Sequence, residues 1–255
     1  MLSAHYGLNR YLNTMTSSAK NYNELYRLQD KVLLALSGHF GIFHLTGGTA
    51  LGRFYLNHRY SEDLDFFTNQ NNAFTSEANN IRSLLKKQFN TSDDKIILYQ
   101  DYIRVWVPGE EDLKIEMVND VAERWGSPIL AGTTPVDTVG NILANKLTAI
   151  LSRDEPKDVF DIVCIASNFS FNWGDVFVYS LRKAIIAEPD VLMRMTTFPV
   201  EWLPEQRWLK DPLDLPAFRE KLNRIADDFL LAKDNSLGVG KTPLENAKPE
   251  FIALR

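Results

Sequence analysis

The stretch LTGGTALGRFYLNHRYSEDLDFF, residues 45–67, decides the fold because three local patterns follow one another in it. The apolar residues 42–45 predict a short buried strand that runs into Gly47-Gly48. TALGRFYLN then predicts a helix, with Thr49 as its N-cap. EDLDFF alternates polar and apolar side chains, which is typical of a half-buried strand. The segment therefore predicts a strand, a glycine turn, a helix and a second strand in succession.

Asp63 and Asp65 are the chemically informative pair in this segment. Residues two apart on a strand share a face, so the two carboxylates are expected side by side with Leu64 turned into the core. Such a pair repels itself unless a cation lies between the carboxylates, and Mg²⁺ commonly takes one or two carboxylates together with phosphate oxygens. A D-x-D pair alone is a weak signal, but Phe66 and Phe67 follow at once. This setting favours a metal site over a solvated strand end.

Gly47, Gly48 and Thr49 join the first strand to the helix. Glycines let a backbone approach phosphates closely, and a helix N-terminus offers free N–H groups and the positive end of the helix dipole. No Gly-Lys-Thr follows, so this is not a Walker loop. A plain tight turn explains the same residues and stays open as the alternative.

Three further strands are predicted in residues 95–118, namely KIILYQ, YIRVWV and LKIEMV, with a PGEED turn before the last. Glu116 is the one acid in the middle of this apolar last strand. A carboxylate in such a position faces either the solvent or a cation. It is therefore either a third metal ligand that could also deprotonate an attacking hydroxyl, or an ordinary exposed glutamate.

The predicted secondary structure changes near residue 125, where predicted strands are followed by predicted helices. Residues 126–135, rich in Gly and Pro, suggest a linker. We therefore expect a strand-rich domain over 1–125 and a helical subdomain over 126–255 that completes a cleft between them. Helices are predicted over 22–38, 76–89, 136–152, 156–168, 173–187 and 215–233, and an irregular tail over 235–249.

NKLTAILSRDEPKDVFDI, residues 145–162, carries charges that suit a phosphate site. Lys146 and Arg153 fall on one face of a helix, and Asp158 and Asp161 share a face of the next helix. Lysine and arginine side chains that point into a cleft would neutralise triphosphate oxygens and developing negative charge. A set of salt bridges among these acids and bases is the alternative, and an Asp–Arg pair would also orient the arginine.

Composition limits the class of protein. A chain of 255 residues with 45% hydrophobic residues is an ordinary globular protein, and its net charge of −5 gives no overall basic footprint for nucleic acid. Cys164 is the single cysteine, which excludes an internal disulfide, and its apolar helix predicts an inert buried thiol. His44 is expected in the core, since no histidine has metal-ligand spacing. Without a signal-like start or a membrane-length apolar run, the chain is expected to be cytoplasmic.

Three segments together resemble the nucleotidyltransferase superfamily and, within it, the AbiEii-type (MenT-like) toxins of type IV toxin–antitoxin systems. They are residues 45–67, LKIEMV at 113–118 and residues 145–162, and they occur in the family's order over about 120 residues. The resemblance implies an α+β fold, in which a small mixed sheet flanked by helices is followed by a helical subdomain. It also implies an NTP as donor substrate and two Mg²⁺ ions.

The resemblance assigns roles to individual residues. Asp63, Asp65 and Glu116 would hold the metal, although such enzymes usually have Asp where this chain has Glu116. The same three acids and Lys146 would be catalytic. Ser61 is expected on the strand face of Asp63. The residues implied to contact the nucleotide are Gly47, Gly48, Thr49, Ser61, Lys146, Arg153 and Asp161.

Three hypotheses for function remain at this point. Some members of the family add nucleotides to tRNA acceptor ends, which implies NTP, tRNA and a cognate antitoxin as partners here, and no membrane. The alternatives are transfer to a small molecule or a protein hydroxyl, and a non-catalytic NTP-binding module. RNA binding needs a local basic strip near the cleft. Its candidates are Arg53, Arg59, Lys86, Lys87, Arg182 and Lys183.

Overall fold

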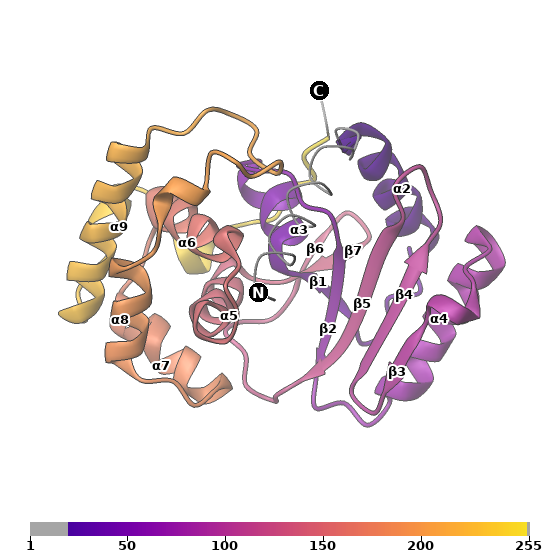
Figure 1. Cartoon of the computed structure of the whole chain (residues 1–255). Helices are drawn as coiled ribbons and strands as arrows, with labels where there is room; N and C mark the ends of the chain where they lie inside the picture. Colours follow the sequence, from indigo (N-terminus) through magenta and orange to yellow (C-terminus); the bar gives the residue numbers. More distant parts are fainter. Residues whose placement is uncertain (1–19, 254–255) are drawn as a thin grey trace, which may run out of the picture.

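The computed structural model describes residues 20–253 and contains one seven-stranded sheet in the order β3-β4-β5-β2-β1-β7-β6 (Figure 1). The sheet is mixed, because β2 runs parallel to β5 and β1 parallel to β7, whereas its other neighbours are antiparallel. The strands are β1 (His44–Thr46), β2 (Leu64–Asn69), β3 (Ile97–Tyr99), β4 (Tyr102–Val107), β5 (Leu113–Asp120), β6 (Ile129–Ala131) and β7 (Thr134–Val136).

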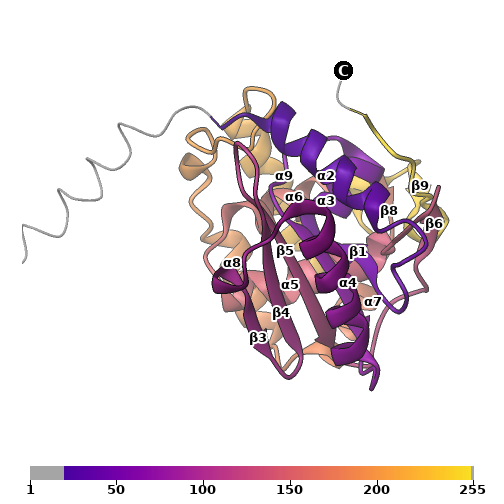
Figure 2. The same ribbon diagram turned by 90° about the vertical axis from the view of Figure 1, so that its right-hand side faces the viewer.

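Helices α2 (Tyr22–Ala35) and α4 (Phe74–Phe89) cover one face of the sheet, and the helical half of the chain lies on the other side (Figures 1 and 2). That half consists of α5 (Val139–Ser152), α6 (Pro156–Asn168), α7 (Trp173–Lys183), α8 (Glu188–Thr196) and α9 (Leu215–Leu230). The predicted α+β fold, a mixed sheet flanked by helices and followed by helices, is confirmed.

Strict alternation in β2, β4 and β5 separates a core face from a polar face. Along β2 the side chains of Leu64 and Phe66 are fully buried, while Asp65 and Phe67 between them are half-buried. Burying the apolar members stabilises the sheet by about 1.5–3 kcal/mol per side chain, which fixes the register because a slip by one residue would turn the aspartate into the core. The polar face therefore points away from α2 and α4.

The glycine segment follows the predicted order with shifted boundaries. Strand β1 ends at Thr46, helix α3 covers Gly47–Leu51, and a π-helical turn continues it over Gly52–Leu56. The prediction of Thr49 as N-cap is wrong, because the helix already begins at Gly47 and Thr46 occupies the cap position. Gly47 has a φ of 69°, so a glycine is needed at the turn itself.

The linker predicted at residues 126–135 is wrong. Strands β6 and β7 occupy this segment, and β7 pairs in parallel with β1, where Leu45 lies opposite Val136. The Gly and Pro residues mark a hairpin at the sheet edge, in which Gly132 adopts a φ of 61°. The division of the chain at residue 125 stays a prediction, although the sheet extends past it.

The end of the chain ties the two halves together. Short elements η4 (Ser236–Gly238), β9 (Thr242–Pro243) and η5 (Leu244–Asn246) interrupt the tail that was expected to be irregular, and β9 pairs with β8 (Phe169–Ser170). Further on, the backbone N–H groups of Glu250 and Ile252 donate to the carbonyls of the π-helical turn. Helix α8 and the 3₁₀ turns η2 (Asp93–Lys95) and η3 (Val200–Trp202) were not predicted. No helix among residues 20–253 has the length and apolar character to cross a membrane.

Candidate active site

A cleft of about 700 Å³ separates the polar face of the sheet from the helical half. Strands β2 and β5 supply one wall, and helix α5 and the start of α6 supply the other. The Gly47-Gly48 turn lines the cleft beside Asp65. Of the predicted site residues, all line this cleft except Thr49 and Asp161, which are buried next to it. The structure thus gathers residues from three distant segments of sequence.

The three predicted metal ligands lie on the same wall. Asp65 and Glu116 are direct partners across the parallel β2–β5 pair, so their side chains point to the same side of the sheet. Asp63 directly precedes β2, which begins at Leu64, two residues after the start of the alternating pattern at Glu62. All three carboxylates line the cleft. The reading of Glu116 as an ordinary exposed glutamate does not hold, since its side chain is only 17% exposed.

The Asp65 carboxylate carries the electrostatic cost of this arrangement. Burial, then the charges of Asp63 and Glu116, raises the pKa of Asp65 to about 7. No hydrogen bond or ion pair within residues 20–253 reaches this carboxylate. A side chain at Gly47 would place its Cβ 2.8 Å from Asp65 Oδ2, so the glycine also makes room for the acid. Asp65 is thus the one member of the trio that lacks a positive partner.

Glu116, in contrast, is well neutralised. Arg104 on β4 donates to Glu116 Oε1 from Nε at 2.8 Å and from Nη2 at 2.6 Å, and the Tyr102 hydroxyl donates to the same oxygen. Burial raises the pKa of Glu116, but these hydrogen bonds and the charge of Lys114 outweigh it and hold the pKa at about 2. A carboxylate with so low a pKa is a weak general base. The base role of Glu116 stays a prediction.

Lys114 occupies the position between two of the acids. Its Nζ lies 3.0 Å from Asp63 Oδ2 and 3.2 Å from Glu116 Oε2. Lys114, Arg104 and Tyr102 were missed as site residues. The signal was present, because Lys114 is two residues before Glu116 on one strand and therefore shares its face.

The donor set fits Mg²⁺ in its chemistry. Three carboxylates face one cavity, and an ammonium group already fills the space between Asp63 and Glu116, so the site demands positive charge. Among residues 20–253, no group of three or more Asp, Glu, His or Cys side chains has an arrangement that could hold a metal ion as it is. In the structure Lys114 Nζ lies between Asp63 and Glu116, where a shared metal ion would compete with it.

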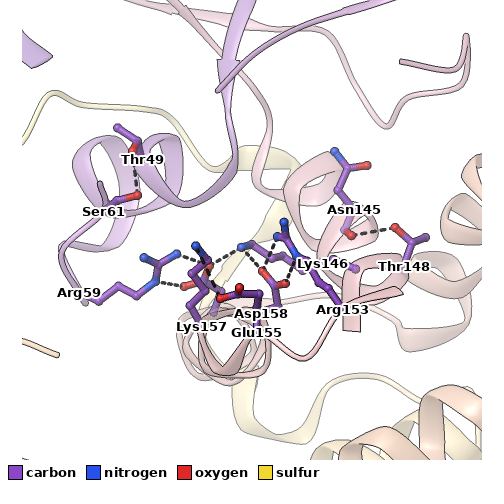
Figure 3. Close-up of polar contacts among 12 residues, drawn as sticks. Thr49, Arg59, Ser61, Asn145, Lys146, Thr148, Arg153, Glu155, Lys157 and Asp158 are labelled. Carbon is purple, nitrogen blue, oxygen red and sulfur yellow. Dashed lines mark hydrogen bonds and ion pairs between the residues drawn. The ribbon is translucent and has the colours of Figure 1, made fainter. Parts of the chain in front are cut away.

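Thr49 and Ser61 hold the glycine turn against the acidic strand (Figure 3). The Thr49 hydroxyl lies 2.8 Å from Ser61 Oγ and donates to the backbone carbonyl of Asp63. Ser61 lines the cleft, but it lies in the loop before β2 and not on the strand face expected for it. A Cβ on Gly48 would come within 2.3 Å of Arg59 Nη2, so packing alone requires a glycine there. The contacts of both glycines with phosphate stay a prediction.

Asp161 is the centre of a buried charge network behind the cleft. Arg59 donates to its two oxygens at 2.6 and 2.8 Å, His58 Nε2 lies at 2.8 Å, and Lys146 Nζ lies at 2.7 Å. Burial of Asp161 raises its pKa, but the charges of Arg59 and Lys146 and the hydrogen bonds hold it well below the usual range. Its carboxylate is therefore fully occupied by protein donors, which favours the salt-bridge alternative for this residue.

Lys146 joins this network to Asp158. Its Nζ lies 2.6 Å from Asp158 Oδ1, and Arg153 donates to the same carboxylate from Nε at 2.7 Å (Figure 3). Lys146 is 5% exposed, whereas half of the Arg153 side chain is exposed at the cleft. The Asp–Arg pair that the spacing suggested is formed. It orients the guanidinium toward the cavity that holds the acids.

The basic strip proposed for RNA is not formed by its six candidates. Arg53 is 1% exposed and pairs with Asp30, so its prediction as a surface contact is wrong. Arg59 lines the cleft but is 2% exposed and pairs with buried Asp161. Lys86 and Lys87 lie on α4, on the opposite face of the sheet from the cleft (Figure 2). Of the remaining two, Lys183 lines the cleft.

Two further predictions hold. His44 is buried and its Nε2 lies 3.9 Å from Asp137, while burial lowers the pKa of His44 to about 4, so it is a neutral core residue. Burial raises the pKa of the Cys164 thiol to about 12, which makes it inert at neutral pH. His58, by contrast, gains a contact with Asp161 that its sequence neighbourhood did not indicate.

The sequence profile of a family described as "Nucleotidyl transferase AbiEii toxin, Type IV TA system" matches residues 31–248. The chain belongs to this family. The match spans both walls of the cleft and every predicted site residue. This AbiEii-family protein is therefore a nucleotidyltransferase.

Solved structures share the fold of this AbiEii-family chain at low identity. A Helicobacter pylori protein described as a nucleotidyltransferase is 19% identical, over 78% of this chain and 91% of its own, with a TM-score of 0.51. JHP933 of H. pylori is 20% identical over 78% and 88%, with a TM-score of 0.49. The MenT4 nucleotidyltransferase toxin of Mycobacterium tuberculosis is 17% identical over 81% and 82%, with a TM-score of 0.48. The first of these supports the fold alone. The comparison with curated proteins found no match.

The buried network makes a stability prediction for Asp161→Asn. The substitution leaves Arg59 buried without its anionic partner, and removing one member of a buried pair costs about 3–5 kcal/mol. Urea unfolding at pH 7 measures the loss. The control is Asp154→Asn, whose side chain is 74% exposed and pairs with Arg194, and which should change stability by less than about 1 kcal/mol. Equal stabilities of the two variants would contradict the network's role.

The raised pKa of Asp65 makes a prediction for pH. The pKa of Asp65 is about 7 in the folded chain, against an ordinary value of 3.8. Between pH 3.8 and pH 7 the folded state therefore keeps a proton on Asp65 that the unfolded state has released. Asp65 should therefore destabilise the metal-free fold increasingly as pH rises from 4 to 7, whereas buried His44, whose pKa is lowered to about 4, acts in the opposite direction over part of this range, so a variant is needed to isolate Asp65. Asp65→Asn should remove this destabilisation, raising the unfolding free energy at pH 8 by about 1–4 kcal/mol and leaving it unchanged near pH 3. A pH-independent difference from the parent chain would argue against the assignment.

Proposed function

We propose that this chain is a Mg²⁺-dependent nucleotidyltransferase that moves a nucleoside monophosphate from an NTP to tRNA, as the toxin of a toxin–antitoxin pair. The observation that carries the proposal is the cleft in which Asp63, Asp65 and Glu116 face Lys146 and Arg153. A triphosphate needs positive charge on its oxygens, and an acidic trio needs a cation between it and that triphosphate. Both requirements meet in one cavity of about 700 Å³.

Each wall has a separate task in the proposed reaction. Mg²⁺ held by Asp63, Asp65 and Glu116 would supply charge neutralisation of the phosphates and activation of the attacking hydroxyl. Arg104 and Tyr102 keep the Glu116 carboxylate ionised and fixed in direction. On the opposite wall Arg153, oriented by Asp158, would bind the triphosphate as a fork-shaped donor.

Lys146 and Asp161 act less directly in this proposal. Lys146 is shared between two buried aspartates, so its ammonium would add a positive field at the cleft wall and contact phosphate from a fixed position. Asp161 would position Lys146 and Arg59 without touching the nucleotide. The Gly47-Gly48 turn, supported by Thr49 and Ser61, would admit the phosphates beside Asp65.

The proposed reaction is tested by label transfer. Purified protein is incubated with Mg²⁺ and each of the four α-³²P-labelled NTPs, with and without total tRNA. We expect label to move to tRNA, and Asp65→Ala to abolish the transfer because a metal ligand is lost, while circular dichroism shows an unchanged fold. Full transfer by Asp65→Ala would refute the metal role of the aspartate.

The same assay separates the alternatives. Label that moves only to a small molecule or to protein would replace tRNA as the acceptor. Tight NTP binding without transfer to any acceptor would favour a non-catalytic binding module. A cognate antitoxin is tested by co-purification of the product of any gene next to the coding sequence and by loss of transfer when it is added.

Lys114 provides a test of the metal site that does not depend on activity. Lys114→Met removes the ammonium that competes with a metal ion for Asp63 and Glu116. We therefore expect Mn²⁺ to bind about tenfold or more tightly without NTP, which corresponds to roughly 1.4 kcal/mol of binding free energy. Isothermal titration calorimetry measures the affinity. The control is Lys157→Met, because Lys157 lines the cleft and pairs with Glu155, and its charge reaches Asp65 only at longer range, so its removal should raise the affinity less. Equal affinities in both variants would show that the ammonium does not occupy a metal position.

A further inference from the structure

Strands β3 and β4 extend the acidic wall outward as an open aromatic surface. Tyr99 pairs with Tyr102 in the antiparallel register, and antiparallel partners have side chains on the same face. Tyr102 contacts Glu116 through its hydroxyl, so this face is the one that bears the acids. The ring centres of Tyr99 and Tyr102 are 6.2 Å apart. The aromatic surface therefore begins at the acid trio.

This surface is available to a ligand. The Tyr99 side chain is 70% exposed, although the two rings are tilted by 37° and do not stack on one another. On the opposite face of β4, Ile103 and Val105 are buried under the helical layer of α2 and α4 (Figure 2). Tyr99 is therefore accessible on the same face of the sheet as the acids.

The chemistry of the surface favours an unpaired nucleobase. The residues of β3 and β4 on this face are Ile97, Tyr99, Tyr102, Arg104 and Trp106, and Arg104 is the one charged group among them. Its guanidinium lies 5.5 Å from the Tyr102 ring centre and is paired with Glu116 at 2.6 Å, so the surface offers flat rings rather than a free cation. Such rings suit a base that stacks, as on other sheet surfaces that bind single-stranded nucleic acid.

We infer that Tyr99 and Tyr102 form a stacking platform for the 3′-terminal nucleobase of a single-stranded RNA acceptor, which rests on the proposed transfer to RNA. Stacking on this platform, whose inner ring touches Glu116, directs the terminal ribose toward the acid trio. Positioning of this kind supplies orientation for the attacking hydroxyl without reading sequence. Tyr99 is the residue to test, because it is exposed and contacts none of the acids.

The test compares two fluorescein-labelled RNA decamers that differ only at the 3′ end, one with a terminal base and one with an abasic ribose. Fluorescence anisotropy with Mg²⁺ and without NTP gives both affinities. We expect the parent chain to prefer the intact end by about tenfold, as loss of one base stack implies. Tyr99→Ala should lose this preference, whereas Tyr99→Phe should keep it because the ring remains.

The matched control is Leu98→Ala on the same strand. Leu98 is 52% exposed but points to the opposite face of the sheet, so its substitution should leave the preference intact. A preference that survives in Tyr99→Ala, or that is absent in the parent chain, overturns the platform. The platform is also overturned if Tyr99→Ala abolishes binding of a protein to this surface and leaves RNA binding unchanged.

Failure of the platform is separable from failure of the proposed function. NTP binding with Mg²⁺ is measured on the same preparations and does not require Tyr99, while label transfer is measured on the parent chain. Transfer to RNA together with no end preference would remove the platform and keep the enzyme function. An end preference that Tyr99→Ala abolishes, in a chain that transfers no label, would keep the platform and remove the proposed function.

Discussion

The structure depends on the repulsion among three carboxylates that the β2–β5 register brings together. Asp65 and Glu116 are cross-strand partners and Asp63 lies beside them, so folding concentrates negative charge on one wall. Lys114 and Arg104 offset part of this repulsion, because they form ion pairs with Asp63 and Glu116. Asp65 is left without a partner, and its raised pKa reports the remaining imbalance. A site that is short of positive charge is the physical basis for binding a divalent cation.

The opposite wall of the cleft contains buried positive charge. Lys146, Arg59 and Arg153 are drawn into or beside the core, which would be costly without Asp158 and Asp161 to pair with them. The result is a neutralised network that fixes the position of every charged atom. Because its members come from the loop before β2 and from two helices, the network also joins the sheet to the helical half. Rigid placement of charge is what electrostatic catalysis requires.

The glycine turn connects these two walls. Gly47 is needed for its backbone conformation and for the space it leaves to Asp65, and Gly48 leaves space for Arg59. One dipeptide thus lies against the unpartnered acid on one side and against the buried arginine on the other. Substitution at Gly47 would disturb the acids, and substitution at Gly48 would disturb the network of the buried arginine.

The sequence by itself determined the local pattern: the alternation around Asp63 and Asp65, the apolar strand around Glu116, the helices that carry Lys146 and Asp161, and the family to which they belong. The pattern follows from periodicity and spacing, which are local properties, whereas the family was indicated by the resemblance of three segments. Only the tertiary structure decided that β6 and β7 join the sheet, that Arg53 and Arg59 are buried, and that Lys114 lies between two acids. Pairing across strands and burial of charge depend on contacts between segments far apart in the chain, and no local pattern encodes those distances.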